Sequence, residues 1–172
     1  NEDHFIVCVP PDREALRLKG RLLAVADGMG GHAAGARASN IATTELRAAF
    51  VSAPMETPTD PLLVEAFRSA NRAVLEAGEA DPTRRGMGTT LVAAVIAGLS
   101  LTVANIGDSR CYLHRRGQLH QVTTDHTVAN EVMEEQRSYG GSSIDLVTLK
   151  ASSLAHQLTR CVGLDPDGGL PD

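Results

Sequence analysis

The chain has 172 residues, of which 42% are hydrophobic and 22% charged, and its formal net charge is −5 at pH 7. This composition is typical of one globular domain, and mild acidity without a basic run argues against a nucleic-acid-binding protein. No apolar stretch is long enough to span a membrane. The three cysteines are odd in number and widely spaced, which argues against a disulfide framework or a zinc site and favours a cytoplasmic location.

The first half of the chain predicts two strands followed by two helices. Short apolar runs predict strands over residues 4–9 and 21–26, with a charged, turn-prone segment between them. A glycine-rich turn follows, and residues 33–50 are rich in helix formers. The second helix begins at Asp60, which we expect to cap it, and its apolar residues recur every three or four positions until Gly78.

The second half predicts two β-hairpins and then a polar segment. Strands over residues 89–97 and 100–106 stand at hairpin spacing, as do strands over 111–115 and 118–122. Strands this close in sequence must pair antiparallel, because a parallel return needs a crossover of about a dozen residues or more. Residues 124–159 predict short helices and a mobile loop. Helices inserted into antiparallel sheets predict an α+β domain rather than a Rossmann-type fold.

Carboxylates stand at the ends of three predicted strands. Asp27 ends an apolar run and is followed at once by a glycine-rich turn; the alternative is that it caps the next helix. Glu2 and Asp3 precede the first strand, or belong to a frayed terminus. Asp108 follows another strand; the alternatives are that it pairs with Arg110 or that it braces a tight turn. If these strand ends meet at one edge, they form an oxygen-only, negatively charged pocket of the kind that Mg²⁺ and Mn²⁺ prefer.

Five ordered motifs resemble the protein phosphatase 2C family of metal-dependent serine/threonine phosphatases, and the form of the glycine-rich motif is similar to the bacterial branch. The motifs are Asn1-Glu2-Asp3, Asp27-Gly28-Met29-Gly30-Gly31-His32, Gly88-Thr89-Thr90, Asn105-Ile106-Gly107-Asp108-Ser109-Arg110 and Leu158-Thr159-Arg160. The resemblance implies a four-layer αββα fold, in which helices flank a sandwich of two antiparallel β-sheets.

The resemblance also implies a cofactor of two Mn²⁺ or Mg²⁺ ions that share a bridging water. Asp27 matches the carboxylate that bridges both ions, and Gly28 matches a residue whose carbonyl binds one of them. Glu2 matches a further ligand of that ion, and Asp3 matches its neighbour, which supports the metal-bound waters. Asp108 matches a ligand of a third, weaker ion. We therefore expect Asp27 and Asp3 to be the catalytic residues.

The activity that the resemblance implies is hydrolysis of phosphoserine and phosphothreonine on proteins, the substrates of a serine/threonine kinase. A water activated by two cations needs no protein nucleophile, and the chain shows no Ser-His-Asp or Cys-His arrangement. Met29 stands where some relatives carry a histidine thought to act as the general acid, so the general acid is not identified. No substrate-binding residue is assigned. Residues 124–159 match the family's flap, a variable segment beside the site.

Two further aspartates of the family pattern are missing, because the chain stops before the strand that would carry the first of them. We therefore expect residues 1–172 to be a single, incomplete phosphatase 2C-like domain. The alternative function is a catalytically incompetent binding or regulatory module. A structural Ca²⁺ domain held by Asp27 and Asp108 is a weaker alternative, because the oxygen ligands around each aspartate are sparse. His126 is left unassigned.

Overall fold

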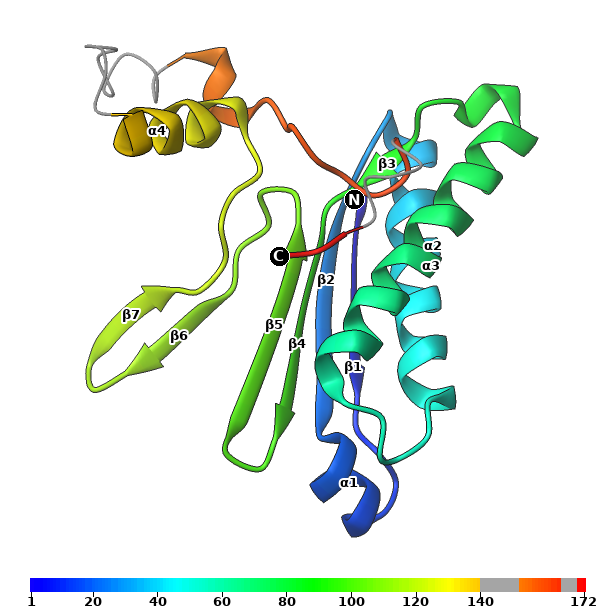
Figure 1. The fold of residues 1–172 in the computed structure, drawn as a ribbon. Helices are drawn as coiled ribbons and strands as arrows, with labels where there is room; N and C mark the ends of the chain where they lie inside the picture. Colours follow the sequence, from blue (N-terminus) through cyan, green and yellow to red (C-terminus); the bar gives the residue numbers. More distant parts are fainter. Residues whose placement is uncertain (140–151, 165–169) are drawn as a thin grey trace.

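The computed structural model describes residues 1–139, 152–164 and 170–172. Its centre is an antiparallel sheet in the order β1 (Asp3–Cys8), β2 (Arg21–Met29), β4 (Leu91–Ala97) and β5 (Ser100–Ile106). The short strand β3 (Gly88–Thr89) pairs with the C-terminal end of β2, at Gly28 and Met29. Figure 1 shows the long strands running side by side.

The β1–β2 pair fixes what stands at its two ends. The register runs from Asp3 opposite Asp27 to Cys8 opposite Leu22. In the sequence, the short helix α1 (Arg13–Lys19) connects the two strands. It begins where the Asp12 side chain accepts a hydrogen bond from the N–H of Ala15. This pair therefore has an acidic end at Asp3 and Asp27 and a distal end at α1.

Two long helices cover one face of the sheet (Figure 1). These are α2 (His32–Ser52) and α3 (Thr59–Ala80), followed by a 3-10 turn, η1 (Pro82–Arg84). Alternate residues of β2 are buried against the helices, since side chains of a strand point to opposite faces. The core side chains that are fully buried include Leu22, Leu46, Phe67, Leu91 and Ile106.

The other face of the sheet is apolar and exposed. Phe5 is 71% exposed, and Val7, Val25 and Ile96 also exceed 40%. The hairpin of β6 (Tyr112–Arg115) and β7 (Gln118–Gln121) forms a second antiparallel sheet. A cavity of about 340 Å³ lies between the exposed face and residues at the start of this hairpin.

The chain continues into α4 (Val128–Tyr139), and a 3-10 turn, η2 (Ser153–His156), packs near it. Figure 1 shows that both lie away from the distal end of the sheet. Two stretches of the predicted polar segment, 124–139 and 152–159, are thus described. Residues 140–151, the centre of the predicted flap-like segment, lie outside the described residues.

The α+β class and the antiparallel sheets predicted from sequence are confirmed. Two local predictions were wrong. The segment expected to be a turn contains α1, because its residues Arg13–Lys19 are good helix formers behind an Asp cap. Asp60 does not cap α3: the cap position is Pro58, and the Asp60 carboxylate accepts a hydrogen bond from the Thr102 hydroxyl at 3.3 Å instead.

Candidate metal centre

Asp3 and Asp27 face each other at the acidic end of the β1–β2 pair. They are direct register partners in the antiparallel ladder, so their side chains leave the sheet on the same face. That face is the exposed one, which also carries Phe5 and Val25. Two like charges held directly opposite each other destabilise a sheet. A contribution to the stability of the fold therefore does not explain why this pair is present.

The backbone of Asp27 is fully hydrogen-bonded. Its N–H donates to the Thr90 hydroxyl at 3.0 Å. Its carbonyl accepts from the N–H of Thr90 and from the Thr89 hydroxyl, both at 2.9 Å. Only the carboxylate of Asp27 is therefore left to interact with a ligand, and the strand end that carries it is fixed.

The pKa of the Asp27 carboxyl is raised above its ordinary value of 3.8. Partial burial is the largest cause, followed by a hydrogen bond with the Asp3 side chain and by the negative charges of Asp3, Asp108 and Glu2. Asp27 keeps an exposed surface, so a solute can still reach it. A divalent cation would relieve this repulsion, and an oxygen-only donor set suits Mn²⁺ and Mg²⁺. The residue types around Asp27 therefore suit the ions that the family pattern implies.

Glu2, the residue before β1, is placed by close contact with the end of β2 and with α2. Its carbonyl accepts hydrogen bonds from the N–H of Gly28 at 3.3 Å and from the Ser39 hydroxyl at 2.6 Å. Its carboxylate lies against Gly35, where an added Cβ would come within 2.1 Å of Glu2 Oε2. An added Cβ at Gly28 would come within 2.0 Å of the Gly35 carbonyl oxygen. Both glycines are therefore needed for this packing.

Asp108 follows β5 in a turn that starts at Gly107, whose φ is +99°. This glycine packs directly on Thr90, since an added Cβ would lie 2.7 Å from Thr90 Cγ2. The Ser109 hydroxyl is hydrogen-bonded to the Thr90 hydroxyl at 2.7 Å. Because Thr90 also accepts the N–H of Asp27, a single side chain anchors both the Asp108 turn and the Asp27 strand end.

One cavity of about 390 Å³ brings Asp27, Gly28 and Asp108 together. Its wall includes His156 and Leu158, so the later part of the predicted flap-like segment borders the same space. Asp3 lines a neighbouring cavity, and Glu2 lines neither of the two. Among the described residues, no three His, Cys, Asp or Glu side chains are placed to coordinate one ion together.

Sequence reasoning gave no role to Thr90, Ser109 or His126. Thr90 and Ser109 belong to the quoted motifs, and a hydroxyl beside a glycine turn is the signal that marks each as a turn anchor. His126 follows the second hairpin and has no such local signal, because its partners come from distant parts of the chain.

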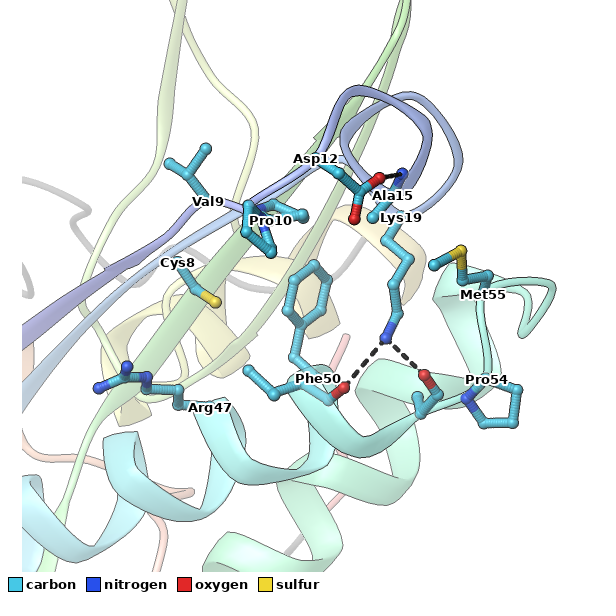
Figure 2. A pocket seen from close by; sticks show the side chains of 13 residues that line it. Cys8, Val9, Pro10, Asp12, Ala15, Lys19, Arg47, Phe50, Pro54 and Met55 are labelled. Carbon is cyan, nitrogen blue, oxygen red and sulfur yellow. Dashed lines mark hydrogen bonds between the residues drawn. The ribbon is translucent and has the colours of Figure 1, made fainter.

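A larger cavity, of about 520 Å³, lies at the distal end (Figure 2). Lys19 from α1 donates hydrogen bonds to the carbonyls of Val51 and Ala53, where α2 ends, and its Nζ lies 5.7 Å from the centre of the Phe50 ring. Asp12 on the same wall caps α1. These charged groups are engaged with the backbone, so Lys19 fastens α1 onto the C-terminal end of α2.

With this geometry in place, comparison with known proteins identifies the class. Residues 1–142 match the model of the family described as "Protein phosphatase 2C". The chain belongs to this family.

Several bacterial phosphatases are similar to the chain. The serine/threonine protein phosphatase PstP of Mycobacterium tuberculosis is 44% identical over 120 residues, which cover 68% of this chain and 23% of that protein. The phosphatase stp of Listeria innocua is 36% identical over 136 residues, covering 77% of this chain and 52% of that protein. The chain thus spans about a quarter to a half of the length of these relatives.

Solved structures agree with the fold. The phosphatase Stp1 of Staphylococcus aureus superposes with a TM-score of 0.82 at 27% identity, covering all of this chain and 63% of that one. The catalytic domain of PstP, solved "in complex with 2 Manganese ions", superposes with a TM-score of 0.68 at 32% identity. The match covers 99% of this chain and 69% of that one. Within the described residues, no helix is both long and apolar enough to cross a membrane.

Proposed function

We propose that this protein hydrolyses phosphoserine and phosphothreonine on proteins with the help of two Mn²⁺ or Mg²⁺ ions. The observation that carries the proposal is the Asp3–Asp27 pair, two carboxylates held opposite each other beside Asp108 at the cost of mutual repulsion. Membership of the family and the manganese-bound relative support the choice of reaction.

Bound divalent ions would activate a water for attack on phosphorus and neutralise the phosphoryl oxygens. Asp27 would hold the ions through its carboxylate, and Gly28 would add its backbone carbonyl. Glu2, pressed against Gly35, would supply a further oxygen. Asp3 would accept hydrogen bonds from waters beside Asp27. Asp108, which lines the same cavity, would hold a third, weaker ion.

The substrates that fit this chemistry are proteins phosphorylated by a serine/threonine kinase, and we place the reaction in the cytoplasm, where Cys8 and Cys111 stay free thiols. Residues 124–159 would act as the flap beside the site, since His156 and Leu158 line the cavity.

The proposal is tested by phosphate release from a phosphothreonine peptide, with and without MnCl₂, by the wild-type protein and Asp27→Asn. We expect release that depends on Mn²⁺ and falls about 100-fold or more in the variant, since a loss of about 3 kcal/mol of charge stabilisation corresponds to that factor. Release without added metal, or equal release by the variant, would contradict the proposal.

A further inference from the structure

His126 is a buried histidine that joins three distant parts of the chain. It is 5% exposed. Its backbone N–H donates to the Gly107 carbonyl at 3.0 Å, and its carbonyl accepts from the N–H of Thr159 at 3.0 Å. It therefore connects the turn after β5 with the segment that follows η2.

The ring of His126 adds a second bond to the same turn. Its Nδ1 lies 3.0 Å from the backbone N of Gly107. A backbone N–H can only donate, so Nδ1 is the acceptor and carries no proton. The proton of the neutral ring is then on Nε2. Gly107 is held by both its N–H and its carbonyl, and it directly precedes Asp108.

The far side of the ring faces a carboxylate. Nε2 lies 2.9 Å from Asp172 Oδ2 and 3.0 Å from Arg160 Nη1, and the same Arg160 nitrogen donates to Asp172 Oδ1 at 2.8 Å. Burial alone would raise the pKa of Asp172, but the bonds from His126 and Arg160 outweigh it and the pKa is lowered. Asp172 is itself fixed, since its backbone N–H and carbonyl pair with those of Asn105 in β5. Figure 1 shows this end of the chain beside β5.

We propose that His126 is a positioning residue, which holds the Gly107 turn so that Asp108 faces the cavity shared with Asp27. The inference rests on the proposed function, because Asp108 is a ligand only in that account. Two side-chain hydrogen bonds hold the turn: one joins the hydroxyls of Ser109 and Thr90, and the other runs from the Gly107 N–H to His126 Nδ1. Hydrogen-bond partners behind a metal ligand typically alter metal affinity by about 10- to 100-fold when they are removed.

Two substitutions separate the two ends of the ring. His126→Asn keeps an acceptor close to the position of Nδ1 and loses the reach to Asp172. His126→Gln places its amide near the position of Nε2, so it keeps the reach to Asp172 and loses the acceptor for Gly107. If the turn is what matters, the Gln variant is the damaging one.

The experiment is calorimetric titration of MnCl₂ into the wild-type protein and four variants, with thermal unfolding of each metal-free protein alongside. Asp108→Ala identifies the binding event that depends on Asp108, and Asp27→Asn tests the proposed centre itself. We expect His126→Gln to weaken the Asp108-dependent event about 10-fold and His126→Asn to change it less than about 3-fold.

If Asp108→Ala weakens Mn²⁺ binding and neither His126 variant does, the positioning role is overturned and the proposed function stands. Equal losses in both His126 variants, with equal loss of stability, also overturn it, because His126 would then serve only folding. Failure of the wild-type protein to bind Mn²⁺ overturns both proposals.

If His126→Gln does not fold, hydrogen exchange of the Gly107 amide in the wild-type protein replaces it. A positioning role predicts slower exchange of this amide when MnCl₂ is added. Unchanged exchange would overturn the role.

Discussion

The two ends of the β1–β2 pair differ in how their charges are satisfied. At the distal end, Asp12 caps α1 and Lys19 donates to the carbonyls that end α2. At the acidic end, Asp3 and Asp27 face each other, and the pKa of Asp27 is raised by partial burial first and then by its acidic neighbours. Charges at the distal end stabilise the fold, whereas those at the acidic end oppose it. Unrelieved repulsion of this kind is expected at a site that binds a cation.

The sharpest test of this difference substitutes one aspartate at each end. We expect Asp3→Asn to lower Mn²⁺-dependent phosphate release about 10- to 100-fold, because it removes a group that supports the centre. Asp12→Ala should leave release unchanged and lower the free energy of unfolding by about 1 kcal/mol, through loss of the helix cap. Peptide assays and urea unfolding measure the two effects. A loss of activity in Asp12→Ala equal to that of Asp3→Asn would remove the distinction.

A second test alters the packing behind Glu2. Gly35→Ala would place a Cβ 2.1 Å from Glu2 Oε2 and 2.9 Å from the carbonyl carbon of Gly28, so we expect Mn²⁺ affinity to fall about 10-fold as these groups are displaced. The matched control is Gly78→Ala in α3, where the nearest contact of a Cβ is 3.4 Å. The control should keep its affinity and gain up to about 1 kcal/mol of stability from helix propensity. Calorimetric titration with MnCl₂ compares them, and unchanged affinity in Gly35→Ala would show that Glu2 is not a ligand.

The distal end can also be weakened alone. Lys19→Met removes a charged donor to two helix-terminal carbonyls, so we expect a loss of about 2 kcal/mol of stability and no change in Mn²⁺ affinity. Arg13→Met in the same helix, at an exposed position, is the control and should cost little. Chemical unfolding measures the stability. A weaker Mn²⁺ affinity in Lys19→Met would mean that the two ends are coupled.

The smallest effect concerns pH. Because the pKa of Asp27 is raised in the folded state, the folded protein binds this proton more tightly than the unfolded chain. The metal-free protein should therefore lose stability as the pH rises from 3.8, the ordinary pKa, through the raised pKa of folded Asp27. At higher pH its stability should stay constant at the reduced value. Asp27→Asn should lack this loss and unfold at a higher temperature at pH 7. A lower midpoint in the variant would argue against repulsion at the acidic end.

Sequence alone predicted much of this architecture, because short apolar runs and two-residue turns determine antiparallel strands locally. It placed Ser100–Ile106 correctly and missed α1, where a short helix lies in a charged segment. The glycine beside a carboxylate drew attention to Asp27 and Asp108. The partners of Thr90 and His126 could not be predicted, because they are 63 and 19 residues away in the sequence. Such pairings depend on how the elements pack.

The most direct test of the account is calorimetric titration of MnCl₂ into the wild-type protein and Asp27→Asn at neutral pH. We expect saturable binding by the wild-type protein that is weakened at least about 10-fold in the variant, with the variant still folded. Equal binding by the two proteins would show that the carboxylates at the end of β1 and β2 do not hold the metal.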